Sequence, residues 1–116
     1  MIGDSKKKYI FLVRGILNEG SAKGFAYDFI EAAGMHPARP GRIDQYPYNG
    51  HGGIGWTGYF PLIESYLIID VYIPQGYTEI LLSTCKPEAV RLNYLEEILN
   101  DRIGKVEKLI EHDIVV

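Results

Sequence analysis

The sequence has a single cysteine, no excess of positive charge and no long apolar run. The lone Cys85 excludes an internal disulfide and is typical of a reducing compartment, so we expect a cytoplasmic protein. Twelve Lys and Arg against fifteen Asp and Glu give a net charge of −3, which disfavours nucleic acid as a partner. Asp70 interrupts even the richest apolar stretch, from Tyr66 to Ile73, so no membrane helix is expected.

The composition is that of a folded globular protein. Of the 116 residues, 47% are apolar and 23% are charged, and the length suits a single domain over residues 1–116. Lys6 to Lys8 precede the apolar run Tyr9 to Val13 in the manner of a signal peptide. Arg14 ends that run after five residues, so a first strand is predicted there instead.

Hydrophobic spacing predicts two amphipathic helices. One covers about residues 21–34, where Ser21 is a candidate N-cap and Gly34 a candidate stop. Pro87 opens the second, which extends to about Asn100.

The remaining segments predict strands and one long loop. β-branched and aromatic runs indicate strands over 9–13, 64–73, 77–85, 103–110 and, as a short addition, 114–116. Region 36–58 holds three of the six prolines and many glycines, so we expect a long loop with at most short strands near 43–46. The order predicts an α+β protein, a two-layer α/β sandwich with a mainly antiparallel sheet and two helices on one face.

Three familiar motifs fail on their context. Residues 50–55 satisfy G-x-G-x-x-G, but 56–61 cannot open a helix, so no dinucleotide site is expected. The His-Gly-Gly at 51–53 lacks the G-x-S-x-G elbow of a serine hydrolase. The three histidines and Cys85 fall at no metal-ligand spacing, so we expect no metal.

Aromatic side chains are dense around the glycine-rich segment. Rings of this kind stack on purines or face a cationic sulfonium, and the alternative is that they only fill the core. The set comprises Tyr46, Tyr48, Trp56, Tyr59, Phe60 and Tyr66.

The stretch from Gly55 to Cys85 carries a family resemblance. It reads Gly-Trp-Thr-Gly-Tyr-Phe-Pro-Leu-Ile-Glu-Ser-Tyr-Leu-Ile-Ile-Asp, followed by Gly76-Tyr77 and Leu82-Ser-Thr-Cys85. This pattern resembles the small prokaryotic S-adenosylmethionine decarboxylases, which act in polyamine (spermidine) biosynthesis. The match has no gaps and covers about a quarter of the chain.

The resemblance implies a self-made cofactor. In that family the serine of a Glu-Ser pair attacks the preceding carbonyl, and elimination leaves a pyruvoyl group that acts as an electron sink during decarboxylation. Ser65 would become the pyruvoyl group and Glu64 would end the upstream fragment. Cys85 would reprotonate the α-carbon, and S-adenosylmethionine or a related amino acid would be the substrate. The family forms dimers, so a homo-oligomer is expected.

Two positions depart from the family pattern. Asp70 stands where the family has a histidine that assists self-cleavage, and Ile68 stands where it usually has a serine. A buried Asp70 with a raised pKa would still serve as a base, and Thr57 would supply a second hydroxyl. Strict alternation puts Ser65 and Asp70 on opposite sides of a strand, so joint action would require a bend or bulge.

Two other functions keep the same fold. An unprocessed chain would bind S-adenosylmethionine either as a lyase that releases methylthioadenosine or as a sensor. An interaction module would use its exposed aromatic side chains for subunit contacts. For the enzyme we expect catalysis by Glu64, Ser65, Asp70 and Cys85, and substrate binding by Tyr48, Trp56, Thr57, Tyr59 and Tyr66.

Overall fold

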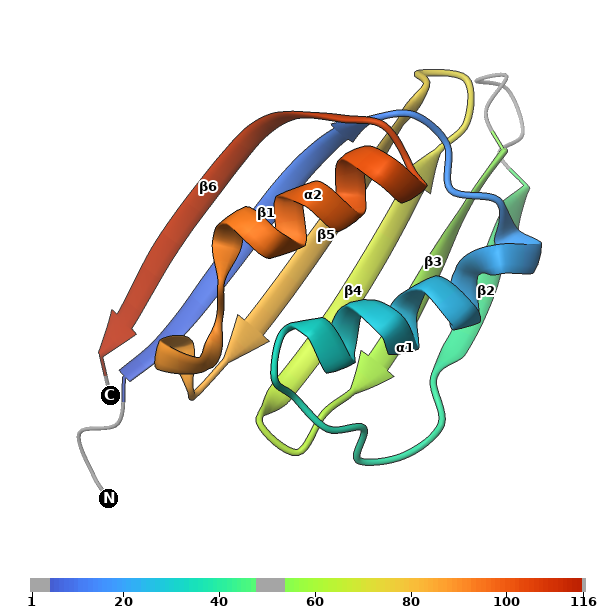
Figure 1. The fold of residues 1–116 in the computed structure, drawn as a ribbon. Helices are drawn as coiled ribbons and strands as arrows, with labels where there is room; N and C mark the ends of the chain where they lie inside the picture. Colours follow the sequence, from blue (N-terminus) through green and yellow to red (C-terminus); the bar gives the residue numbers. More distant parts are fainter. Residues whose placement is uncertain (1–4, 48–53, 116) are drawn as a thin grey trace.

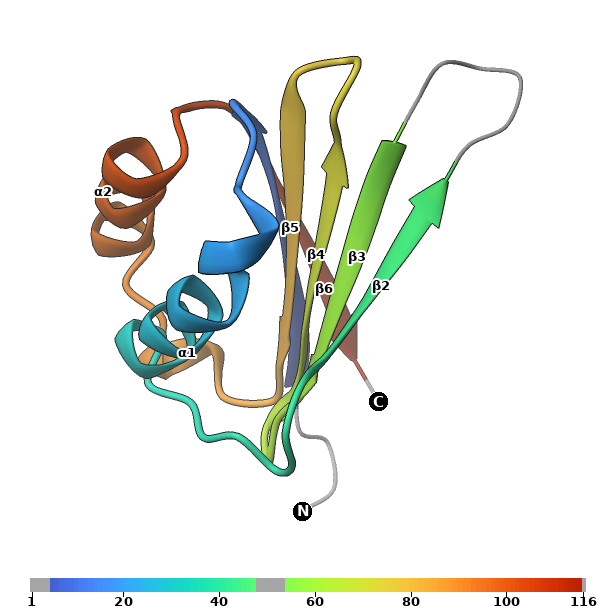
Figure 2. The same ribbon diagram turned by 90° about the vertical axis from the view of Figure 1, so that its right-hand side faces the viewer.

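A computed structural model describes residues 5–47 and 54–115 as two layers (Figure 1). Six antiparallel strands form one sheet in the order β2-β3-β4-β5-β1-β6, and both helices cover the same face of it (Figure 2). This confirms the predicted α+β sandwich. The elements are β1 (Ser5–Arg14), η1 (Glu19–Ser21), α1 (Ala22–Ala32), β2 (Arg42–Pro47), β3 (Ile54–Pro61), β4 (Ser65–Tyr72), β5 (Tyr77–Thr84), η2 (Pro87–Ala89), α2 (Leu92–Arg102) and β6 (Lys105–Val115).

The core lies between the helices and one face of the sheet. Helix α1 buries Phe25, Phe29 and Ile30, at the spacing that gathers side chains on one helix face. From α2, Leu95 and Leu99 are buried completely. Each large side chain buried in this way stabilises the fold by about 1.5–3 kcal/mol.

Helix α1 begins after Ser21, as the sequence predicts, whereas α2 begins later than predicted. Ser21 precedes α1 without a side-chain hydrogen bond, whereas Asn18 caps the short turn η1 through Gly20 N–H. Gly34 adopts φ +74° after α1, as expected of a helix stop. Pro87 opens only the turn η2, because the chain is extended at Val90 before α2 begins.

The prediction of a loop over 36–58 is wrong for much of that segment. Strands β2 and β3 pair in continuous register, from Arg42 opposite Tyr59 to Pro47 opposite Ile54. Glycine here permits close packing, because a Cβ on Gly55 would lie 2.6 Å from the Val71 carbonyl oxygen. Residues 48–53, including Tyr48, lie outside the described part of the chain.

The second face of the sheet has no helix over it in Figure 2. Along β4, Leu67, Ile69 and Val71 are buried against the helices, whereas Ile68 and Asp70 alternate with them and are half-buried. We call the side without helices the open face. In the described ranges, no helix is long and apolar enough to cross a membrane.

Candidate active site

The Glu64–Ser65 peptide lies where β4 begins and β5 ends. Ser65 is the register partner of Thr84, and Cys85 follows directly. The Cys85 backbone N–H donates to the Glu64 carbonyl oxygen at 3.0 Å. A hydroxyl attack on that carbonyl would place negative charge on this oxygen, and a donor already faces it.

The Glu64 side chain is held from the opposite direction. It is only 6% exposed; its Oε1 accepts from His36 N–H at 2.9 Å and its Oε2 lies 2.7 Å from His36 Nδ1. Burial raises the pKa of this carboxyl, but the hydrogen bonds from the His36 ring and backbone outweigh burial, so the net pKa is lowered. Glu64 is therefore fixed at both its carbonyl and its carboxylate.

The segment around His36 fastens the β3–β4 loop. Ile63 N–H donates to the His36 carbonyl at 2.9 Å and Ala38 N–H to the Pro61 carbonyl at 2.9 Å, and Pro37 forms a bridge with Leu62. His36 is not among the residues that the sequence predicts for the site. No sequence signal links His36 to Glu64, because only the folding of α1 back over the sheet brings them together.

The Ser65 hydroxyl has a buried partner. Its Oγ donates to Ser83 Oγ at 2.8 Å, and Ser83 is fully buried. Ser83 belongs to the Leu-Ser-Thr-Cys motif that ends at Cys85, but the motif predicts no role for it. Cys85 itself is exposed.

Asp70 and Thr57 form a separate group. Thr57 Oγ1 donates to Asp70 Oδ1 at 2.5 Å, and Asp70 pairs in register with Glu79 on β5. Burial, and then the Asp70 carboxylate, raise the pKa of Glu79. The β4 register is continuous from Ser65 to Tyr72, so Asp70 lies about 16 Å along the strand from Ser65.

The predicted aromatic residues also divide. Tyr59 and Tyr66 meet at 6.5 Å between ring centroids, and Tyr66 adjoins Ser65. Trp56 is 3% exposed and pairs with Val71 near the other end of β4. The structure thus brings Tyr59 and Tyr66 toward the Glu64–Ser65 peptide, and it places Trp56 elsewhere.

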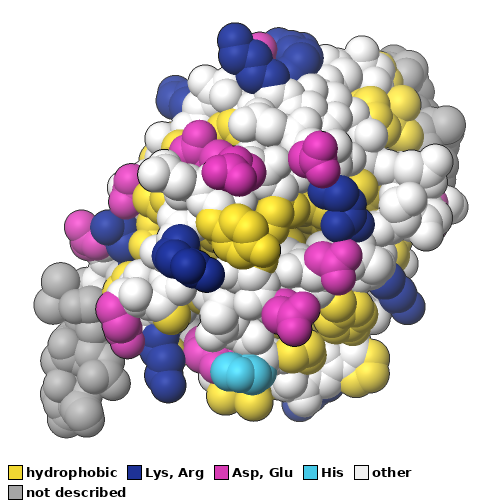
Figure 3. All heavy atoms as spheres, viewed as in Figure 1, with side chains coloured by type: hydrophobic (Ala, Val, Ile, Leu, Met, Phe, Trp, Pro, Cys, Tyr) yellow, Lys and Arg dark blue, Asp and Glu magenta, His cyan; other side chains and the backbone are white. Residues whose placement is uncertain are grey.

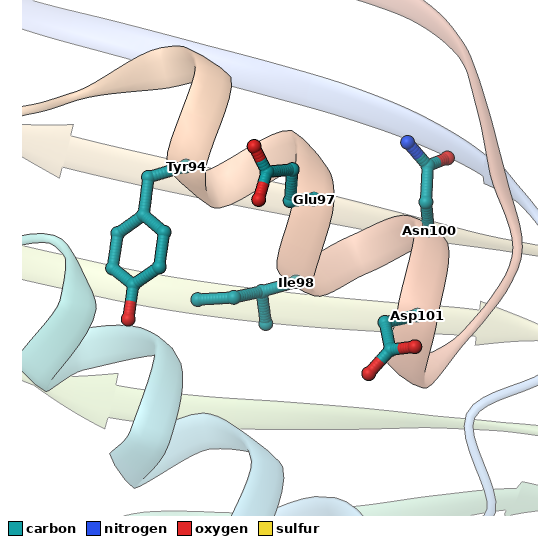
Figure 4. Close-up of a pocket in the computed structure, with 5 residues that line it drawn as sticks. All are labelled: Tyr94, Glu97, Ile98, Asn100 and Asp101. Carbon is teal, nitrogen blue, oxygen red and sulfur yellow. The ribbon is translucent and has the colours of Figure 1, made fainter.

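Three hollows in the surface lie away from this peptide. One, of about 500 Å³, follows α2 and is lined by Tyr94, Glu97, Ile98, Asn100 and Asp101 (Figure 4). A second of about 500 Å³ reaches across to α1; Figure 3 shows apolar side chains in this region with charged ones around them. The third, of about 230 Å³, includes Gly55, Trp56 and Ile73 in its lining.

The fold of this chain is similar to that of a solved structure, although its sequence matches no known family. No family model matches the sequence, and no curated protein matches it. Among solved structures, the fold is similar to the crystal structure of the adenosylmethionine decarboxylase from Aquifex aeolicus VF5. The TM-score is 0.63 at 13% identity, over 98% of this chain and 91% of that one, so the likeness establishes the fold.

Proposed function

We propose that this chain is an S-adenosylmethionine decarboxylase-like enzyme that cleaves itself between Glu64 and Ser65. The observation that carries the proposal is the Cys85 N–H on the Glu64 carbonyl oxygen, beside a serine whose hydroxyl is held by Ser83. The fold of the Aquifex aeolicus enzyme and the motif from Gly55 to Cys85 support the same class.

The proposed cleavage uses groups already in place. Ser65 Oγ bonds to the Glu64 carbonyl carbon, the peptide C–N bond breaks, and the hydroxyl proton ends on the released amine. Loss of the Ser65 Cα proton and cleavage of its Cβ–O bond then free the Glu64 carboxylate. Water replaces the nitrogen of the resulting dehydroalanine and ammonia leaves, which produces the pyruvoyl group.

Residues around the N-terminus that cleavage would create at Ser65 suit the decarboxylation step. The pyruvoyl group would supply an electron sink for decarboxylation. The exposed Cys85 thiol would protonate the α-carbon, and the Tyr59 and Tyr66 rings would face the sulfonium of S-adenosylmethionine. A related amino acid such as arginine or ornithine is the alternative substrate.

The denaturing intact mass of freshly purified protein tests self-cleavage. We expect fragments of 64 and 52 residues, the second blocked by a pyruvoyl group, and release of carbon dioxide from S-adenosylmethionine. Ser65→Ala is the matched control and should remain one 13.1 kDa chain. An intact wild-type chain would overturn the pyruvoyl mechanism.

We further propose that Asp70 acts from a second copy of the chain. Within one chain it lies too far along β4 to touch Ser65. The open face carries Ile10, Ile68 and Leu81 in one row across three strands, so a second sheet packed there would bury apolar surface. Such a homo-oligomer would carry each Asp70 toward the partner's site.

A second candidate function follows from the end of the sheet that lacks Ser65. On the open face, the Asp70 carboxylate, which accepts a hydrogen bond from Thr57, would stabilise the positive centres of S-adenosylmethionine without any self-cleavage. An intact wild-type chain that binds S-adenosylmethionine in calorimetry would support a sensor, and release of methylthioadenosine would support a lyase. Ser65→Ala would leave both activities unchanged, whereas Asp70→Asn would weaken them.

A further inference from the structure

Ser83 is a buried polar residue that forms and breaks no bond in the proposed cleavage. Its Oγ accepts the hydrogen bond from Ser65 at 2.8 Å, and its exposed fraction is 0%. Ser83 belongs to the open-face positions of β5, because Leu82 and Thr84 on either side of it have the opposite parity. Because no helix packs on the open face, other side chains must bury Ser83 there.

Lys8 and Tyr66 supply that cover. Ser83 is the register partner of Tyr66 on β4 and of Lys8 on β1. The Lys8 Nζ lies 5.8 Å from the centre of the Tyr66 ring, so the lysine side chain spans β5 over Ser83. The lysine side chain and the aromatic ring thus cover the Ser83 hydroxyl, whereas Ser65 is half-buried.

This shielding leaves Ser83 as the partner that orients the Ser65 hydroxyl. A serine side chain chooses among three staggered rotamers, and a hydrogen bond donated to a fixed acceptor favours one of them. The attack on Glu64 requires a rotamer that aims an Oγ lone pair at the carbonyl carbon. The nearby Lys8 charge also favours the negative charge that develops on Ser65 Oγ as its proton leaves.

We propose that Ser83, covered by Lys8, is a positioning residue for the self-cleavage of the Glu64–Ser65 peptide. This inference rests on the proposed function. The competing interpretation is that the hydrogen bond between two serines on neighbouring strands only stabilises the sheet.

The test follows the fraction of intact chain with time by denaturing mass spectrometry. Ser83→Ala is expected to slow cleavage about tenfold, the worth of one ordinary hydrogen bond. Ser83→Thr keeps the hydroxyl on a strand-compatible side chain and should restore the rate. If Ser83→Ala does not fold, Ser83→Cys, which keeps the volume with a weaker acceptor, should give an intermediate rate.

Two further variants separate positioning from stability and charge. Thr78→Val removes a fully buried hydroxyl from the far end of β5, where Thr78 bonds to Gly15 and Leu17; it should lower the melting temperature but leave the rate unchanged. Lys8→Met should slow cleavage about threefold and Lys8→Arg should restore it, because a half-buried charge that makes no direct contact contributes less than a direct hydrogen bond.

The outcomes distinguish failure of the role proposed for Ser83 from failure of the proposed function. A Ser83→Ala protein that cleaves at the wild-type rate overturns the role of Ser83 and leaves the proposed function standing. Equal slowing by Ser83→Ala and Thr78→Val shows a structural role only, which also overturns it. A wild-type chain that never cleaves overturns the proposed function and this inference together.

Discussion

The two ends of β4 differ in how their carboxylates are surrounded. At the start of the strand, the Glu64 carboxylate, the Glu64 carbonyl and the Ser65 hydroxyl each have a partner that fits their chemistry. Near its other end, Asp70 accepts a hydrogen bond from Thr57 but also stands opposite Glu79, so two carboxylates share one part of the open face.

The difference also appears in the pKa shifts of the two carboxyls. The first end lowers the pKa of its carboxyl, Glu64, through donors from His36. The second raises the pKa of Glu79 through burial and the Asp70 charge. Polar atoms converge on one peptide bond at the first end, whereas two carboxylates face each other across neighbouring strands at the second.

The largest expected effect comes from removing the donor to the Glu64 carbonyl. Cys85→Pro deletes that backbone N–H and should slow self-cleavage at least about 100-fold, as loss of an oxyanion donor does. The preceding Thr84 is already extended, as a residue before proline must be. Cys85→Ala keeps the N–H and should cleave normally but fail in decarboxylation. Both rates come from time-resolved intact mass, and equal cleavage by the two variants would contradict the backbone role.

The next largest effect is expected from changing Asp70, which we propose acts on the Glu64–Ser65 peptide of a second copy of the chain. Asp70→Asn should slow cleavage about tenfold or more, because it removes a proposed acid–base group. Mixing Asp70→Asn with Ser65→Ala should restore cleavage of the Asp70→Asn chain, since each Ser65→Ala partner supplies an intact Asp70. The measurement is the mass of each chain after refolding the mixture together. Rescue that is absent would show that Asp70 does not act from a second copy.

Removing the His36 side chain that contacts Glu64 should have a moderate effect on the rate of self-cleavage. His36→Ala removes the ring that faces Glu64 Oε2 and should slow cleavage about tenfold, in line with a hydrogen bond to a charged group. His36→Asn places an amide donor near the position of Nδ1 and should recover most of the rate. His112→Ala, at an exposed residue of β6, is the control. If His36→Ala cleaves as fast as His112→Ala, the carboxylate contact does not orient the peptide.

The smallest effect is a stability difference of opposite sign at the two ends, measured by thermal unfolding in a Ser65→Ala background. Glu79 has a raised folded pKa, so its ionisation disfavours folding as pH rises above its ordinary 4.5. Glu79→Gln should therefore stabilise slightly at pH 7 and lose that gain below pH 4.5. Glu64 has a lowered pKa, so its contribution is present above 4.5 and lost as pH falls through the folded pKa. Glu64→Gln should destabilise at pH 7, and the same sign at both ends would refute the contrast.

Local patterns in the sequence predicted the two layers, both helices and most of the strands. The spacing of Phe25, Phe29 and Ile30 predicts the buried face of α1. The strand β3 was missed because Gly55 and Gly58 suggest a break. In the fold, Gly55 instead allows the backbones of β3 and β4 to approach each other.

Contacts across the fold were beyond sequence reasoning. His36 meets Glu64 over 28 residues of chain, and Ser83 meets Ser65 over 18. Neither pair has a spacing that periodicity can recognise, because each depends on how the loop after α1 and the end of β5 close on the β3–β4 turn. Whether Tyr48 belongs with Tyr59 and Tyr66 stays a prediction.

The strand order has a consequence for the products of cleavage. A cut after Glu64 separates β1 to β3 from β4 to β6, yet β1 lies between β5 and β6 and β3 lies against β4. The two fragments are therefore interleaved, and separating them would require three antiparallel ladders to open at once. The cut chain should behave as one folding unit, and the halves made as separate polypeptides should find each other and assemble like a split reporter protein.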